Sequence, residues 1–192
     1  MQPVAQRFFL FGMGQRRKLL YHSGRLCDPF TNELFGRWEV RYADIRPADY
    51  AVHLELAHGE HRAIVEDEEG VWLCTGDDRS PLVRGHLNLP RFEGHPYAAQ
   101  LRQLHHEVLI NIVQGVPLPN LLVYRRPWYR DAALMAMVLE QTGNLFVLEP
   151  WVASLRDPFD RINHGHCEPD NLGQVLYLLA LCADRTHPLV DT

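Results

Sequence analysis

The sequence predicts an α+β protein with an antiparallel β-rich domain in residues 1–90 and a helical domain in residues 91–192. Before residue 90, short apolar runs alternate with turn residues, as in strands joined by hairpins. After it, apolar residues recur at helical spacing. Prolines and glycines concentrate between residues 79 and 94, which is typical of a linker. The change of period across this segment places the domain boundary there.

The N-terminal part is expected to form short antiparallel strands. Val52, Leu54 and Leu56 alternate with His53 and Glu55, so one face of that strand should be buried and the other wet. Short polar turns separate this run from similar ones. The expected strands cover residues 8–11, 18–21, 38–42, 50–56, 63–66 and 71–74. Together they predict a meander or half of a sandwich.

Helices are expected in the C-terminal part. The apolar residues of 96–114 follow helical spacing, and a second helix is expected over 131–142. Residues 116–127 contain three prolines and should be extended. A short helix over 149–155 and a polar loop over 157–167 follow, and the last helix is expected over 169–183.

Two of these helices begin alike. Asp131 and Asp170, 39 positions apart (170 − 131), each open an apolar helix. Helical hairpins repeated at roughly this period stack into toroids or solenoids. A helical repeat needs neighbours on both sides to bury its faces. We therefore expect the front part of a longer protein, or a partner that covers the open helical face.

Two short motifs carry a family resemblance. The segments are 128–132, which reads Trp-Tyr-Arg-Asp-Ala, and 168–174, which reads Glu-Pro-Asp-Asn-Leu-Gly-Gln. In these motifs the chain resembles the six-hairpin glycosidase-like superfamily, and it looks closest to uncharacterised bacterial members. The resemblance implies an (α/α) toroid, here partial, preceded by a β-sandwich. It also implies that the acid of the first motif holds sugar hydroxyls.

The first motif is the expected substrate-binding site. Asp131 would accept hydrogen bonds from sugar hydroxyls, and Arg130 would orient it and keep it ionised. Trp128 and Tyr129 would offer flat faces to a sugar ring. The alternative is structural, because an aspartate in a first turn also caps a helix and complements its dipole. The aromatic residues could equally belong to the core.

The second motif supplies the expected catalytic carboxylates, Glu168 and Asp170. Glycoside hydrolysis usually needs two carboxyl groups roughly 5 to 9.5 Å apart, and burial would raise the pKa of one into the acid role. Asn171 and Gln174 would bind further hydroxyls. The alternative is again a pair of first-turn acids that complement the helix dipole.

Other ligands are not expected. Residues 164–168 contain two histidines, a cysteine and a glutamate, but the spacing matches no usual zinc pattern, and no metal or cofactor is predicted. A formal net charge of −5 without a basic run argues against nucleic acid. No apolar run reaches membrane length, and the four dispersed cysteines are expected to be reduced. A soluble, cytoplasmic protein is therefore expected.

These observations predict a carbohydrate-active protein, a glycoside-hydrolase-like domain acting on glycosidic bonds. The alternatives are a non-catalytic helical module that binds a protein and self-associates through its open face, or an incomplete fragment of a larger enzyme. The exposed apolar surface of such a module would distinguish it from the first hypothesis.

Overall fold

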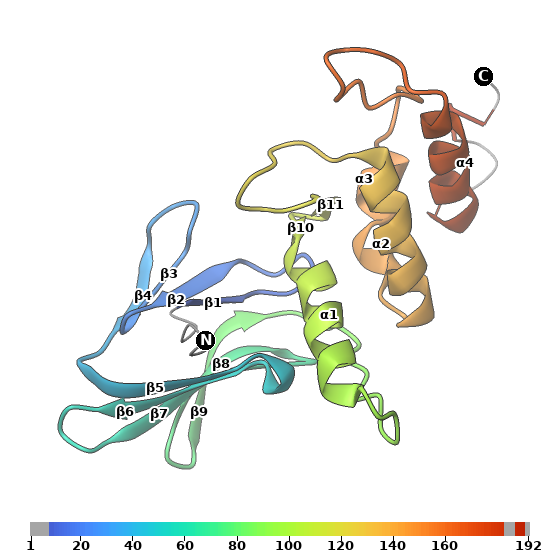
Figure 1. Ribbon diagram of the computed structural model, residues 1–192. Coiled ribbons are helices and arrows are strands. Elements are labelled where there is room, and N and C mark those ends of the chain that lie inside the picture. Colours follow the sequence, from blue (N-terminus) through green and yellow to red (C-terminus); the bar gives the residue numbers. More distant parts are fainter. Residues whose placement is uncertain (1–7, 183–186, 191–192) are drawn as a thin grey trace, which may run out of the picture. The chain divides into compact units, whose positions relative to one another are not determined.

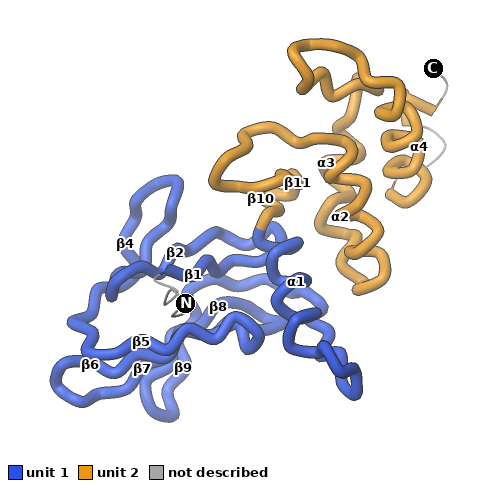
Figure 2. The backbone as a smooth tube through the Cα atoms, in the orientation of Figure 1, with its two compact units in different colours: residues 1–110 blue, residues 111–192 orange. Residues whose placement is uncertain are grey.

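The computed structural model describes residues 8–182 and 187–190 of the chain. It divides into two compact units, an N-terminal unit of residues 1–110 and a C-terminal unit of residues 111–192 (Figure 2). The boundary expected after residue 90 thus lies inside the N-terminal unit, which also contains the first α-helix.

Two antiparallel sheets form most of the N-terminal unit (Figure 1). In each sheet every strand pairs with the next one along the chain, because short turns join them. The first sheet contains β1 (Phe8–Phe11), β2 (Leu19–His22), β3 (Arg25–Cys27) and β4 (Leu34–Arg37). The second contains β5 (Val40–Arg46), β6 (Ala51–Leu56), β7 (His61–Asp67), β8 (Gly70–Thr75) and β9 (Asp78–Arg84), and the 3-10 turn η1 (Pro47–Asp49) joins β5 to β6.

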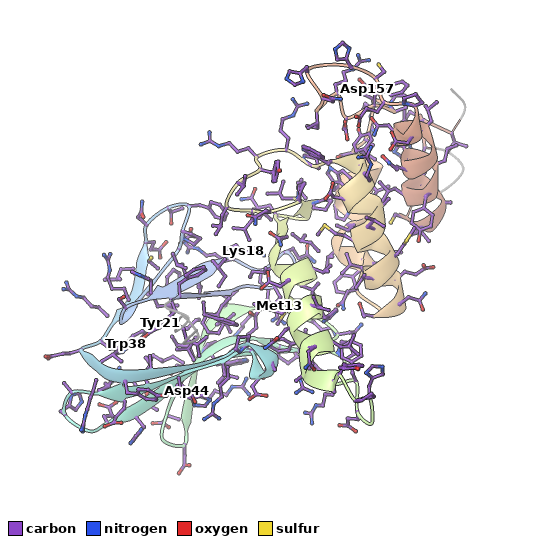
Figure 3. The ribbon with its side chains drawn as sticks, viewed as in Figure 1. Met13, Lys18, Tyr21, Trp38, Asp44 and Asp157 are labelled. Carbon is purple, nitrogen blue, oxygen red and sulfur yellow. The ribbon has the colours of Figure 1, made fainter. Side chains whose placement is uncertain are left out.

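The apolar core of this unit lies between the two sheets. In β6, Val52, Leu54 and Leu56 are buried while the residues between them are half-buried, as the alternation predicts. Tyr21 of the first sheet is buried in the same cluster, and Trp38 packs against it (Figure 3). Burial of these inner faces by apolar side chains holds the two sheets together.

The edge strand β9 occupies part of the expected linker. Pro81 lies in β9 opposite Trp72, beside a bulge in the pairing. A proline has no N–H to donate, so it is tolerated in a strand at the edge of a sheet. The prolines and glycines that predicted a linker therefore lie partly in this edge strand and at its end. The segment that connects β9 to α1 is shorter than the linker that the sequence predicted.

The helix expected at the start of the helical domain belongs to the sandwich instead. This helix, α1 (Ala98–Ile110), packs beside η1. The ring of His106 stacks on Phe9 with centroids 5.0 Å apart, and its Nε2 lies 3.1 Å from the carbonyl oxygen of Leu10. The helix α1 thus packs against η1 and against Phe9 of β1 rather than in a helix pair.

The C-terminal unit is built around two packed helices. Its elements are β10 (Ile112–Val113), β11 (Val116–Pro117), α2 (Tyr129–Gln141), the 3-10 turn η2 (Leu145–Val147), α3 (Glu149–Ala153) and α4 (Asp170–Cys182). The small residues Ala132, Ala133 and Ala136 are buried on α2, which packs against α4. The end expected for the last helix, residue 183, lies outside the described residues.

The expected partial toroid is therefore wrong. Among residues 111–182, α2 and α4 form one helix pair, and α3 has a single short turn beside them. Three antiparallel sheets and four α-helices in the described ranges are compatible with a loose α+β description, but they contain no array of helical hairpins. Helical spacing identifies an apolar face without identifying what covers it. No helix in these ranges is both long and apolar enough to cross a membrane.

Candidate functional site

The first turns of α2 and α4 bring three of the predicted site residues together. Arg130 of α2 donates to Oδ2 of Asp170 from Nε (3.2 Å) and from Nη2 (2.8 Å). The same Nη2 lies 3.6 Å from Oε2 of Glu168. One guanidinium therefore bridges the two carboxylates that the sequence analysis proposed as catalytic. The expected partner of Arg130 was its neighbour in the chain, Asp131.

The amide side chains of α4 support this arrangement. Gln174 donates from Nε2 to Oδ2 of Asp170 (2.9 Å), and its Oε1 accepts a hydrogen bond from Nδ2 of Asn171 (3.0 Å). Asn171 is buried, and its Oδ1 accepts the backbone N–H of Asp160 at 3.3 Å. These amides bind protein groups, so they fix the first turn of α4 and the preceding loop.

Asp160 is a site residue that sequence reasoning missed. Its Oδ2 accepts the backbone N–H of Tyr129 (2.9 Å), and its Oδ1 accepts that of Ile162 (3.1 Å). Trp128, the N-cap residue of α2, makes no side-chain capping bond. Asp160 thus caps α2 from a distant loop. The sequence marked that loop only by its acidic and glycine residues.

A pocket of about 330 Å³ opens beside the ion pair. Residues from the start of α2 and from the loop before α4 line it: Trp128, Arg130, Asp160, Ile162, Asn163, His164 and Glu168. Glu168 is half-buried, and its Oε1 accepts a hydrogen bond from Nδ2 of Asn163 (3.2 Å). The pocket therefore combines an indole, a guanidinium, an amide and carboxylates within one small volume.

The two aromatic residues expected to flank a sugar face different cavities. Trp128 lines the 330 Å³ pocket, whereas Tyr129 is buried and lines a neighbouring cavity of about 260 Å³ with Trp151 and Phe159. The Tyr129 hydroxyl donates to the carbonyl oxygen of Asp157 (2.9 Å), which lies in the loop between α3 and α4 (Figure 3). Tyr129 therefore anchors this loop.

Asp131 lies in the first turn of α2 but outside the lining of the pocket. Its side chain is half-buried, and within the described part of the chain its carboxylate accepts no hydrogen bond. It therefore contributes negative charge near Arg130 without a direct contact in the site. Its expected role as a sugar ligand stays a prediction.

Hydrogen bonds from Arg130 and Gln174 determine the electrostatics of Asp170, one of the two candidate catalytic carboxylates. The hydrogen bond from Arg130 lowers the pKa of Asp170 below its ordinary value, and the bond from Gln174 acts in the same direction. Asp170 therefore stays ionised at neutral pH and cannot act as a proton donor. Glu168, the other member of the pair, lines the pocket, whereas Asp170 does not.

The histidines and cysteine of the loop do not form a metal site. His164, His166 and Cys167 are exposed. Across residues 8–182 and 187–190, no group of three histidine, cysteine, aspartate or glutamate side chains is placed to hold a metal ion.

The N-terminal unit contains a second buried polar cluster. Glu66 is fully buried; it pairs with Arg16 (2.8 Å) and accepts the backbone N–H groups of Gly12 and Met13 (2.8 and 2.7 Å). Lys18 donates to the carbonyl oxygens of Gly12 and Gly14, and burial lowers its pKa to about 7 (Figure 3). Every contact here is to the protein itself, which indicates a structural role.

A larger cavity of about 540 Å³ adjoins this cluster, and some of its charged side chains are engaged with other protein groups. Asp67 pairs with Arg79 and accepts a hydrogen bond from the Trp72 indole, and Arg102 donates to two backbone carbonyls. The smaller pocket beside Arg130 is the candidate ligand site, because three residues that the sequence predicted for the site, Trp128, Arg130 and Glu168, line it.

Comparison with protein-family models, with curated proteins and with solved structures finds no match in any of the three.

Proposed function

We propose that the C-terminal unit binds a saccharide in the pocket beside Arg130 and acts on glycosidic bonds. The observation that supports this most is the convergence of Trp128, Arg130 and Glu168 on one pocket of about 330 Å³. An indole offers an apolar face to the C–H face of a sugar ring. Carboxylate and guanidinium groups accept from and donate to its hydroxyls.

The proposed chemistry gives different roles to the carboxyl groups of Asp170 and Glu168. Asp170, held ionised by Arg130, would stabilise positive charge that develops on the sugar ring. Glu168 would give its proton to the leaving oxygen as the glycosidic C–O bond breaks, and a water molecule would then add to the anomeric carbon and return a proton to Glu168. Two carboxyl groups in different environments, one of them fixed as an anion, are the arrangement that glycoside hydrolysis requires.

Ligand-observed NMR of the purified chain with a panel of mono- and disaccharides tests binding. We expect saturation transfer from the protein to a sugar, and its loss in Trp128→Ala. Trp151→Phe, at the neighbouring cavity, is the matched aromatic control and should keep the signal. Absence of transfer to every sugar, from a chain that circular dichroism shows to be folded, would refute the proposal.

The catalytic step has its own test. Glu168→Gln should retain saturation transfer and lose release of reducing sugar from a disaccharide that the parent chain cleaves. A parent chain that binds sugars and cleaves none would limit the function to binding.

A second candidate function rests on exposed apolar side chains. Leu134 and Met137 of α2 and Leu176 of α4 are 59%, 45% and 60% exposed, away from the buried faces of their helices. Exposed apolar surface of this kind is typical of interaction sites. We propose a second copy of the chain as the alternative partner. Sedimentation velocity over a hundredfold range of concentration tests this, and a constant monomer would refute it.

A further inference from the structure

The cavity of about 540 Å³ in the N-terminal unit carries an inference that is independent of the saccharide site. All of its lining residues lie between residues 48 and 102, so the cavity belongs to one compact unit. Its volume falls within the roughly 300 to 1,000 Å³ that is usual for small-molecule sites. Tyr50, Val65 and Leu89 are buried or half-buried and give the lining an apolar part.

Arg102 of α1 presents a fixed guanidinium to this cavity. Its Nε donates to the carbonyl oxygen of Ala48 (2.8 Å), and its Nη1 donates to that of Arg91 (3.0 Å). Backbone carbonyls hold the group without neutralising its charge, and among the described residues no carboxylate forms an ion pair with it. Its Nη2 therefore keeps donors for a ligand. A side chain that is already held in place also loses little freedom when a ligand binds.

Arg91 adds a second positive group to the lining. It is exposed, and its side chain forms no ion pair or hydrogen bond within the part of the chain that the structure describes. Its backbone carbonyl is one of the two that hold Arg102, so the two residues are neighbours in space. Guanidinium groups without a carboxylate partner suit a ligand carboxylate, because their planar donors match its two oxygens.

Other segments of the lining supply negative charge. Glu68, in the turn between β7 and β8, and Asp49, in η1, are exposed, and neither side chain has a partner in the described ranges. Asp49 follows Ala48, whose carbonyl holds Arg102, whereas Glu68 lies on a different segment. The lining therefore presents unpaired charge of both signs. The other acids of the lining have partners, and these pairs are Glu66 with Arg16, Asp67 with Arg79 and Glu69 with His86.

We propose that this cavity binds a small zwitterion, a free amino acid or dipeptide with apolar side chains. Arg91 and Arg102 hold its carboxylate, and Glu68 holds its ammonium group. The apolar side chain of the ligand packs on Val65 and Leu89. A ligand of a single charge meets like charge in the lining, and this repulsion is stronger in a partly enclosed cavity than in open water. Both ends of the ligand are therefore needed.

The test blocks one charge of the ligand at a time. Leucine, leucyl-leucine, their N-acetyl forms and their amides are titrated into the full chain at mildly acidic pH, where amino groups are protonated, and binding is followed by amide chemical shifts. The N-acetyl form lacks the ammonium group, and the amide lacks the carboxylate. We expect the better of the two unblocked ligands to bind about tenfold more tightly than either of its blocked forms, equivalent to about 1.4 kcal/mol.

Variants assign each end of the ligand to its partner. Arg91→Gln should weaken binding of the unblocked ligand several-fold and leave the amide unchanged, because the amide has no carboxylate. Glu68→Gln should weaken the unblocked ligand and leave the N-acetyl form unchanged. Neither side chain has a hydrogen bond or ion pair to lose among the described residues, so both variants should fold. Arg37→Gln and Glu39→Gln are the matched controls, since both residues are exposed in the same unit and lie outside the lining.

Three results would overturn the inference. The first is a blocked ligand that binds as tightly as its unblocked form. The second is an equal effect of Arg91→Gln and Arg37→Gln, or of Glu68→Gln and Glu39→Gln. The third is the absence of chemical-shift changes at the cavity with both unblocked ligands at millimolar concentration. Saccharide binding is tested separately, because the pocket beside Arg130 lies in the other unit.

Discussion

Arg130 in the first turn of α2 and Asp170 at the first position of α4 form a two-donor ion pair, with distances of 3.2 and 2.8 Å to one carboxylate oxygen. This contact joins the two helices where the pocket opens. Both side chains are about half exposed, so the pair adds little to the stability of the fold. Its consequence is geometric, because it fixes the guanidinium beside Glu168.

Replacing Arg130 tests that geometry. Arg130→Gln should weaken saccharide binding about tenfold or more, because the pocket would lose the guanidinium donor that lines it beside Glu168. The free energy of unfolding should change by less than about 1 kcal/mol. Arg161→Gln is the matched control, since Arg161 forms an exposed pair of the same length with Asp157 and lines the other cavity. Equal binding by both variants would remove Arg130 from the site.

Replacing Asp131 distinguishes residues that line the pocket from a charged residue that lies close to it. Asp131→Ala should lower saccharide affinity less than about threefold, because the carboxylate lies outside the pocket and acts through charge alone. Helicity by circular dichroism should be retained, because Asp160 supplies the cap of α2. An affinity loss as large as that of Arg130→Gln would make Asp131 a direct ligand, as the sequence resemblance implied.

Local sequence patterns predicted where the strands and helices lie better than they predicted what these elements pack against. The alternation of Val52, Leu54 and Leu56 predicted the buried face of β6, since that face depends on neighbours two positions apart. The helical spacing of α1 was equally clear, but this helix packs against η1 and Phe9 of β1 rather than in a helix pair. The toroid failed for this reason, because an apolar helix face does not specify whether a sheet or a helix will bury it.

The candidate site shows the same limit. Arg130, Glu168 and Asp170 were selected because they stand at helix starts, and the structure brings those three together. The contribution of Asp160 required a contact spanning 31 positions, which no local motif records. Consecutive residues at a helix start point in different directions, which is why Trp128 and Tyr129 face separate cavities.

The buried Glu66–Arg16 pair predicts a large effect on the N-terminal unit. Glu66→Gln should lower its free energy of unfolding by about 3 kcal/mol, because Arg16 would keep a buried charge without its counter-ion. Glu55→Gln is the control, since Glu55 pairs with Arg41 at the surface and should cost less than about 1 kcal/mol. Hydrogen exchange of the β6 and β7 amides measures the free energy of unfolding of both variants. Similar decreases in the two variants would contradict a stabilising role for the buried Glu66–Arg16 pair.

The buried histidines of α1 predict that the N-terminal unit loses stability in acid. The pKa of His105 and that of His106 are lowered to about 4, mainly by burial, and the charge of Lys18 contributes to this lowering at His106. In the unfolded chain both would titrate near their ordinary pKa of about 6.5. The unfolded state therefore binds more protons between these values, and stability falls as the pH drops from about 6.5 through about 4.

His106→Gln tests this dependence. Each histidine contributes at most about 1.4 kcal/mol per pH unit inside that window, so losing one titrating group should flatten the slope of unfolding free energy against pH by up to that amount. The glutamine can still donate to the Leu10 carbonyl, which limits the structural change. His58→Gln, in the exposed turn between β6 and β7, is the control for replacing a histidine at the surface. Identical slopes in the two variants and the parent chain would show that acid acts on this unit through other groups.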